Sequence, residues 1–175
     1  MPFYLQELVF QYGYLILYAS LALGILGLPV PDEVLLTFVG YVATEGLLSY
    51  PTSILVGFAG AMTGMSLSYY IGKKLGRPLL WNKGRLFKLT PKHLAKVEGW
   101  FHRFGLWTVS FGYFIPGFRH IPCYLSGISA VQFRKYIRFA GIGALIWCAF
   151  FITIGFVLGN TIDFDSPILP QIFHH

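Results

Sequence analysis

Residues 27–33 read GLPVPDE, and this short stretch breaks a long apolar part of the chain. Proline has no backbone N–H to donate and kinks or ends a helix, so Pro29 and Pro31 predict a broken helix here. The apolar run that follows, residues 34–44, is too short to cross a bilayer alone. Irregular backbone at membrane depth persists only where protein or a watery cavity satisfies its polar groups. The stretch therefore predicts a re-entrant helical hairpin with this break at its tip.

A second break of the same kind occurs at residues 115–122, which read IPGFRHIP. It adjoins another short apolar run, residues 104–118, and it holds two prolines and a glycine: Pro116, Gly117 and Pro122. A second re-entrant hairpin is expected here for the same reason. We expect each hairpin to be followed by a helix that is long enough to span the membrane.

The composition requires lipid as the solvent for much of the chain. Of its 175 residues, 55% are hydrophobic and only 11% are charged, whereas soluble domains carry about 25% charged residues. Three runs lack Lys, Arg, Asp and Glu, and each has the ~20 residues that a helix needs to cross ~30 Å of hydrocarbon: residues 8–31, 46–72 and 139–162. The first run has no basic n-region and no cleavage site, so we expect it to be retained rather than removed as a signal peptide. The sequence therefore predicts an all-α, polytopic membrane protein.

Positive charge is concentrated in one block, since nine of the thirteen Lys and Arg residues lie between Lys73 and Arg103. Such a block is also typical of nucleic-acid binding. Here membrane segments flank it, so we expect no nucleic-acid partner and place the block on the cytoplasmic side. From Thr90 to Phe104, apolar residues recur on one helical face, which predicts an interfacial amphipathic helix. Gly105 is a suitable residue for its end.

An internal repeat supports the paired hairpins. The triplet Phe-Ala-Gly at residues 58–60 recurs at 139–141, and the pattern Ile-Gly-x-x-Leu-Gly at 71–76 recurs at 154–159. The flanking charges predict that the two spans run in opposite directions, which is the inverted-repeat architecture of many secondary transporters. We expect one domain over residues 1–175, with repeat 1 at about 15–76, the basic linker at 77–103 and repeat 2 at about 104–160.

Four polar residues beside the breaks are candidates for a site inside the membrane: Asp32, Glu33, Arg119 and His120. A carboxylate at the bilayer centre costs about 2.5–3.5 kcal/mol on insertion scales, so a partner or a function is expected for it. The guanidinium of Arg119 matches a phosphate group in a bidentate geometry. If the hairpins face each other, Arg119 and Glu33 approach the middle of the membrane from opposite sides. Each residue also has a structural interpretation, in which the acids lie in water, Arg119 snorkels to the interface and His120 is a passive contact.

Two motifs carry a resemblance to a known family: GLPVPDE at residues 27–33 and FGYFIPGFR at residues 111–119. In these motifs the chain resembles the DedA family, membrane proteins that share a domain with the eukaryotic SNARE-associated Golgi proteins. The resemblance implies two facing re-entrant loops, with the family's glutamate at Glu33 and the second arginine of its motif at Arg119. The chain departs from the family pattern at three positions where a charged residue is usual: Gly24, Met65 and Tyr113.

The resemblance also implies the movement of lipids between membrane leaflets. The family's substrates include undecaprenyl phosphate and phosphatidylethanolamine, and some members depend on the proton gradient. We therefore expect a multi-pass lipid translocase of the cell membrane, a flippase or scramblase, with Arg119 on the headgroup phosphate. Glu33 would balance Arg119, engage an amine headgroup or take up a proton. The remaining candidates at the substrate site are Asp32, Tyr113 and His120.

Two other function classes stay open. A membrane scaffold or assembly factor would use the same charges only to fix its fold. An intramembrane lipid phosphatase would need a nucleophilic histidine with supporting groups, and the sequence offers no such set. We expect no catalytic residue and no cofactor. A metal ion is not expected either, because Cys123 and Cys148 have neither a CxxC spacing nor clustered histidines. The expected partner is a phospholipid or polyprenyl phosphate, and a homo-oligomer is left open.

Overall fold

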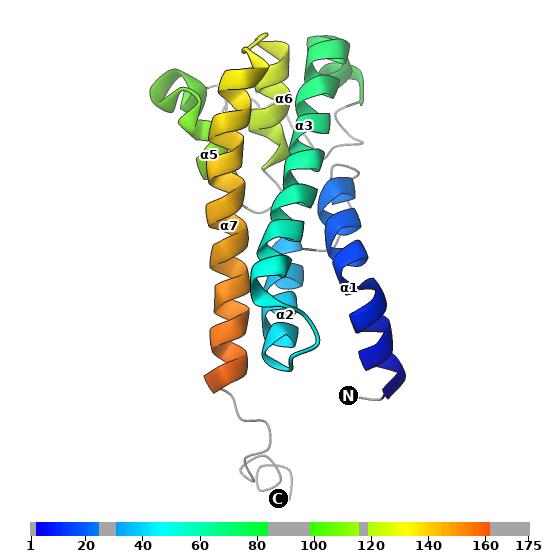
Figure 1. The fold of residues 1–175 in the computed structure, drawn as a ribbon. Coiled ribbons are helices and arrows are strands. Elements are labelled where there is room, and N and C mark those ends of the chain that lie inside the picture. Colours follow the sequence, from blue (N-terminus) through cyan, green and yellow to red (C-terminus); the bar gives the residue numbers. More distant parts are fainter. Residues whose placement is uncertain (1–2, 25–30, 84–98, 116–118, 162–175) are drawn as a thin grey trace, which may run out of the picture.

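The computed structural model describes residues 3–24, 31–83, 99–115 and 119–161, and every regular element within these ranges is helical (Figure 1). Side chains are described for residues 11–24, 31–74, 99–115 and 119–161. The helices are α1 (Phe3–Leu23), α2 (Asp32–Thr44), α3 (Tyr50–Lys83), α5 (Trp107–Gly112), α6 (His120–Ile128) and α7 (Phe133–Thr161). The predicted all-α class is thus confirmed for the described part of the chain.

Two helices are long and apolar enough to cross a membrane: residues Tyr50–Lys74 of α3 and the whole of α7, Phe133–Thr161. They correspond to the charge-free runs 46–72 and 139–162, so both predicted spans are confirmed by length and composition. α1 covers most of the remaining charge-free run, residues 8–31, but ends at Leu23, before the first proline break. Whether α1 crosses the bilayer stays a prediction.

The two long helices run side by side in opposite directions (Figure 1). α2 packs along α7, α6 packs along α3, and α1 packs against α3. α2 and α6 both begin near the middle of the bundle; α2 runs toward the end at which α7 finishes, and α6 runs toward the end at which α7 starts (Figure 1). The N-termini of the two short helices therefore face each other at mid-height.

Glycines let α2 pack closely on α7 and α6 pack closely on α3. A Cβ atom on Gly40 of α2 would collide with the carbonyl oxygen of Ile152 in α7, and one on Gly155 of α7 would collide with the carbonyl oxygen of Thr37. Small residues let helix backbones approach in this way, as is common between membrane helices.

The packing of α6 on α3 repeats this arrangement. A Cβ atom on Gly127 of α6 would collide with the carbonyl oxygen of Tyr69, and one on Gly72 of α3 with that of Tyr124. An offset of 87 residues relates the contacting positions of α2 to those of α6, and an offset of 83 relates those of α3 to those of α7. The two interfaces therefore use equivalent positions, each between a short helix of one predicted repeat and the long helix of the other.

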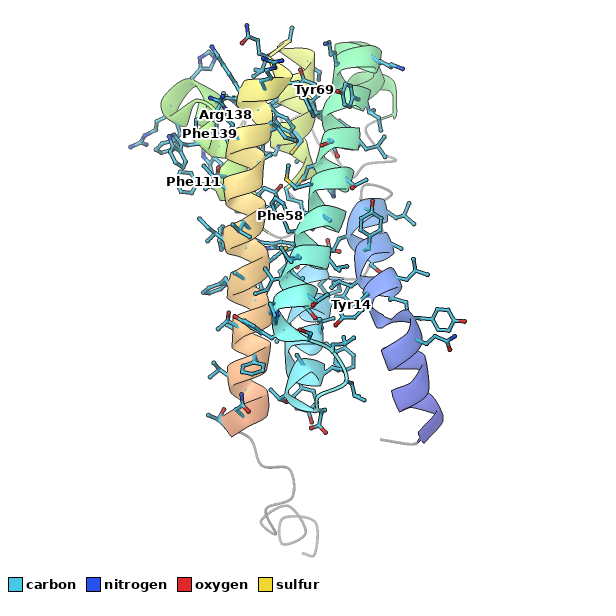
Figure 2. The ribbon with its side chains drawn as sticks, viewed as in Figure 1. Tyr14, Phe58, Tyr69, Phe111, Arg138 and Phe139 are labelled. Atoms are coloured by element: carbon cyan, nitrogen blue, oxygen red, sulfur yellow. The ribbon has the colours of Figure 1, made fainter. Side chains whose placement is uncertain are left out.

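Aromatic side chains pack together at the end of the bundle at which α7 begins (Figure 2). Tyr69 of α3 stacks on Tyr136 of α7, with ring centres 4.7 Å apart. On the other side of α7, the ring of Trp107 in α5 meets Phe139 edge-on at 5.1 Å. At the opposite end, the backbone N–H of Ser49 donates to the hydroxyl of Tyr14, which fixes α1 to the start of α3.

The predicted interfacial helix lies largely outside the described residues. Its described part, residues 99–104, is helical and ends at Gly105, which has a φ of +57° as expected for a helix stop. The breaks at Pro29 and at Pro116 and Gly117 also lie outside the described residues. The re-entrant hairpins, the inverted repeat and the domain boundaries remain predictions.

Candidate functional site

An ion pair joins the start of α2 to the residue that precedes α6. Asp32 is the first residue of α2, and Arg119 directly precedes α6. Their side chains meet with Oδ2 of Asp32 2.7 Å from Nη2 of Arg119. Arg119 is buried, with 5% of its side chain exposed, and Asp32 retains 19%. The close contact is that of an ion pair, because Nη2 makes no aligned hydrogen bond within the described structure.

This ion pair lies at the mid-height of the longest apolar helix. The Cζ atom of Arg119 is 5.2 Å from the ring centre of Trp147, a cation–π contact. Trp147 stands at the centre of α7, with residues 133–146 before it and residues 148–161 after it. At about 1.5 Å of rise per residue, each end of α7 is roughly 21 Å away. If α7 spans the bilayer, the two charges lie near its centre.

Gly24 provides the space for the ion pair. A Cβ atom at this position would collide with Nη2 of Arg119 and would lie 3.6 Å from Oδ2 of Asp32. Gly24 is also one of the positions at which the chain departs from the charge pattern of the family it resembles. The missing side chain leaves room for Arg119 to reach Asp32.

His120 connects Arg119 to α3. The Nε atom of Arg119 donates to Nε2 of His120 at 3.2 Å, and Nδ1 of His120 lies 3.0 Å from Oγ of Ser68. The hydroxyl of Ser68 donates its hydrogen to the carbonyl oxygen of Gly64 at 2.9 Å. Since a hydroxyl has one hydrogen, Ser68 accepts from His120, which assigns the imidazole a proton on Nδ1 and a free acceptor at Nε2.

Besides Nη2 of Arg119, three buried polar atoms around the ion pair have no hydrogen-bond partner among the residues that the structure describes: Nη1 of Arg119, the hydroxyl of Tyr113 and Nε1 of Trp147. The ring centres of Tyr113 and Trp147 are 5.8 Å apart, and both rings are completely buried. Buried donors are nearly always paired, so each such group requires an explanation. All three can donate a hydrogen bond, and an anion with several oxygen atoms can accept from donors of this kind.

Glu33 lies apart from this ion pair. It lines a groove of about 660 Å³ between α2 and α7, with Val34, Thr37, Phe38, Tyr41, Phe151, Gly155 and Leu158. The expected pairing of Arg119 with Glu33 is therefore corrected: the contact is with Asp32. Neighbouring residues of a helix point about 100° apart, so the start of α2 turns Asp32 toward α6 and Glu33 toward the groove.

Two prolines of the predicted breaks are described, Pro31 and Pro122, and both have local structural roles. Pro31 precedes α2 in an extended conformation, with a φ of −68°, and its carbonyl oxygen accepts from the backbone of Val34 and Leu35. Pro122 lies in the first turn of α6, where its missing N–H leaves no helical bond unmade. A Cβ atom on Gly112 would press on Pro122, so these two residues set the close approach of α5 and α6.

Met65 takes part in sulfur and backbone contacts at the position of a usual family aspartate. Its Sδ atom lies 3.2 Å from Sγ of Cys123, and its carbonyl oxygen accepts from the hydroxyl of Tyr136. The thiol of Cys123 also contacts the carbonyl oxygen of Arg119 at 3.3 Å. The side chains of Met65 and Cys123 therefore fill the space on this side of the ion pair.

Sequence reasoning missed two residues of the site. These residues are Trp147 of α7 and Ser68 of α3. One signal was present for Trp147: tryptophans of membrane helices gather at the interfaces, whereas this one stands in the middle of a charge-free run. No pattern in the sequence places Ser68 beside His120, because 52 residues separate them.

The fold and the site define a helical membrane protein in which two short helices meet around a buried acid–arginine pair. The chain belongs to the VTT-domain family, the DedA family of the resemblance, whose model matches residues 30–157. No solved structure matches the chain.

The curated relatives include both uncharacterised and named membrane proteins. The uncharacterised membrane protein YbfM of Bacillus subtilis (strain 168) is 49% identical over 154 residues, which cover 88% of this chain and 95% of that protein. Undecaprenyl phosphate transporter A of the same organism is 30% identical over 146 residues, or 83% of this chain and 74% of that protein. A protein of Lactococcus lactis subsp. cremoris (strain MG1363) that is named alkaline phosphatase-like is 28% identical over 81% of this chain and 68% of its own.

Proposed function

We propose that this protein is a lipid translocase that moves a phosphate-bearing lipid between the leaflets of the cell membrane. Relatives that are named undecaprenyl phosphate transporter A, in Bacillus subtilis and Staphylococcus aureus, support a role in membrane lipid transport. The lipid itself, undecaprenyl phosphate or a phospholipid such as phosphatidylethanolamine, is part of the proposal.

The observation that carries the proposal is the unpaired Nη1 of the buried Arg119. A buried guanidinium strongly favours an anionic partner, and its planar fork matches the oxygens of a phosphate. Asp32 contacts only the Nη2 atom, while Tyr113 and Trp147 hold further unpaired donors in the same cluster. A lipid phosphate would complete these hydrogen bonds.

Asp32 acts as the counterion of Arg119 while no lipid is bound. An unpaired charge in hydrocarbon is costly, so the ion pair lets the empty site persist at the centre of the membrane. An arriving phosphate replaces the carboxylate at Arg119. The N-termini of α2 and α6 carry partial positive charges at the same place, which also favours an anion.

The groove between α2 and α7 is the proposed path for the lipid. It is almost entirely apolar along its length, as suits a hydrocarbon chain, and Glu33 supplies its carboxylate next to Asp32. A carboxylate there attracts an amine headgroup and repels a lipid that carries only a phosphate. Glu33 thus decides between the two proposed substrate classes, or it takes up a proton during transport.

The paired interfaces supply a mechanism for exposing the site to each leaflet in turn. α2 on α7 and α6 on α3 use equivalent glycines, so either short helix can shift along its long partner in the same way. We propose that these movements alternate around the ion pair, as inverted repeats do in other transporters. This requires the two hairpins to be re-entrant from opposite sides.

A lipid phosphatase is the second candidate, favoured by the relatives that are named alkaline phosphatase-like. In the described structure both nitrogens of His120 are engaged, and the hydroxyl of Ser68 donates to a backbone carbonyl. Neither group is placed as a nucleophile with its own base. Release of phosphate from a labelled lipid by the purified protein would support this candidate over transport.

The test is a lipid-crossing assay in liposomes that contain wild type, Arg119→Ala or Glu33→Gln at equal, verified protein levels. Loss of hydrogen bonds to a charged group costs about 1.5–3 kcal/mol, so crossing should slow by at least about tenfold in Arg119→Ala. Undecaprenyl phosphate and phosphatidylethanolamine are assayed separately, and Glu33→Gln should slow only the amine lipid. Equal rates for Arg119→Ala and wild type with both lipids would contradict the proposal.

A further inference from the structure

We propose that Ser68 and His120 are positioning residues for Arg119: they hold the Nε edge of its guanidinium so that the Nη edge faces Asp32 and an arriving phosphate. This inference rests on the proposed function for its consequences in transport. Its geometry, however, is independent of the lipid.

The three hydrogen bonds have only one consistent direction. The carbonyl oxygen of Gly64 can only accept, so the hydroxyl of Ser68 donates to it and its oxygen accepts from Nδ1–H of His120. The other nitrogen, Nε2, is then an acceptor, which suits the Nε–H of Arg119. These hydrogen bonds form a relay from Ser68 of α3 through His120 to Arg119.

The neutral form of His120 is the one that fits this relay. A doubly protonated imidazole would present an N–H to the Nε–H of Arg119 and would place a second positive charge beside the guanidinium. His120 thus serves as an acceptor for Arg119 rather than as a ligand for an anion. This refines its expected role at the substrate site.

Each part of the guanidinium has a separate restraint. Its Nε atom is bonded to His120, its Cζ atom lies over the ring of Trp147 and its Nη2 atom contacts Asp32. Within the described structure Nη2 has only this ion-pair contact, and Nη1 has neither an ion-pair nor a hydrogen-bond partner. A guanidinium that is held in this way loses little conformational freedom on binding a phosphate, which is how a preorganised site gains affinity.

Ser68 anchors the relay to a rigid element. It lies in the middle of α3, with none of its surface exposed, at a point where Gly64 and Gly72 bring α1 and α6 close. Loss of its hydroxyl would free the imidazole to turn without removing much volume. Ser68→Ala is therefore the mildest variant that breaks the relay.

The experiment compares three substitutions in the full-length protein: Ser68→Ala, His120→Phe and His120→Gln. Phenylalanine keeps a flat ring but offers no acceptor, whereas the amide oxygen of glutamine can accept from Nε of Arg119. The first readout is the ¹⁵N-edited NMR signal of the Arg119 Nε–H in detergent, assigned by its loss in Arg119→Lys. We expect slow exchange with solvent in wild type and in His120→Gln, and exchange at least about tenfold faster in His120→Phe, since a bond to a charged group is lost.

The second readout is the retention of phosphate lipid, measured as the apparent affinity for undecaprenyl phosphate or phosphatidylethanolamine in nanodiscs. His120→Phe should weaken it by at least about tenfold and Ser68→Ala by about two- to tenfold, while His120→Gln should restore most of the loss. In an Arg119→Lys background His120→Phe should have no further effect, because lysine has no Nε–H edge to hold.

The outcomes separate the two proposals. Equal Nε–H exchange in wild type and His120→Phe, or equal effects of His120→Phe on lipid affinity with and without Arg119→Lys, would overturn the positioning role. Normal protection of the Nε–H together with phosphate-lipid affinity that does not depend on Arg119 would leave the positioning role standing and overturn the proposed function. If His120→Phe does not fold, Ser68→Ala with unchanged exchange and affinity is the overturning result.

Discussion

Asp32 and Arg119 are 87 residues apart in the sequence, and their side chains meet at 2.7 Å where α2 and α6 begin. They also occupy matching positions: Thr37 and Tyr124, each five residues further along, make the equivalent backbone contacts with glycines of the long helices. The acidic Asp32 at the start of α2 is thus paired with the basic Arg119 at the equivalent position before α6. This relationship gives the bundle its polar centre.

Replacing Asp32 with asparagine should destabilise the empty protein. The change leaves Arg119 buried without a counterion, and removal of one member of a buried pair costs about 3–5 kcal/mol, with less expected here because Asp32 is partly exposed. A phosphate lipid should restore stability to Asp32→Asn more than to wild type, since it takes the place of the carboxylate. The measurement is the unfolding midpoint in detergent with and without added phosphate lipid.

Glu33→Gln is the matched control for this prediction, because Glu33 neighbours Asp32 but faces the groove. Its unfolding free energy should stay within about 1 kcal/mol of wild type, as for most substitutions away from buried networks. Equal destabilisation by both substitutions would show that Asp32 has no special relation to Arg119.

Gly24→Ala should disturb the ion pair directly. The new methyl group would collide with Nη2 of Arg119, so the end of this side chain would have to shift from its position at Asp32. Overpacking of this kind costs about 1–3 kcal/mol. Gly141→Ala is the control, since nothing lies within 4 Å of a Cβ atom there. Comparable unfolding midpoints for the two variants would contradict this role of Gly24.

The two equivalent interfaces should respond alike to the same change. Gly40→Ala forces α2 away from the backbone of α7, and Gly127→Ala forces α6 away from the backbone of α3. Each substitution should lower the free energy of unfolding by about 1–3 kcal/mol in a denaturation series with sodium dodecyl sulfate. A large effect at one glycine and none at the other would argue against equivalent roles for the two short helices.

Opposite directions of α3 and α7 can be tested from outside the cell. Lys74, Lys135 and Asn160 are exposed at or near the ends of the two candidate spans, while the two native cysteines are buried. In right-side-out vesicles, cysteine at position 160 should react with a membrane-impermeant maleimide, and cysteine at positions 74 and 135 should react only after the membrane is opened. Reaction of all three positions from one side would refute the crossing of α7.

Much of the fold could be predicted from charge spacing alone. The absence of charge over residues 46–72 and 139–162 predicted α3 and α7, because a helix in hydrocarbon needs about 20 apolar residues. Pro31 and the acids after it predicted where α2 begins. These features depend only on residues that are close together in the chain, so they can be recognised in the sequence directly.

The partners within the site could not be predicted in the same way. Asp32 and Glu33 are adjacent acids, and which one meets Arg119 depends on the rotation of α2 about its axis, which tertiary packing decides. The roles of Trp147 and Ser68 depend on contacts between α6 and the two long helices. Only the assembled bundle brings these residues to the start of α6.

The most direct test of the central claim is native mass spectrometry of the protein purified with its membrane lipids, for wild type and for Arg119→Ala. Wild type is predicted to retain one phosphate-bearing lipid per chain, and Arg119→Ala, folded and at equal purity, is predicted to lose it. Equal retention of the same lipid by both proteins would contradict the claim that Arg119 holds a lipid phosphate at the centre of the membrane.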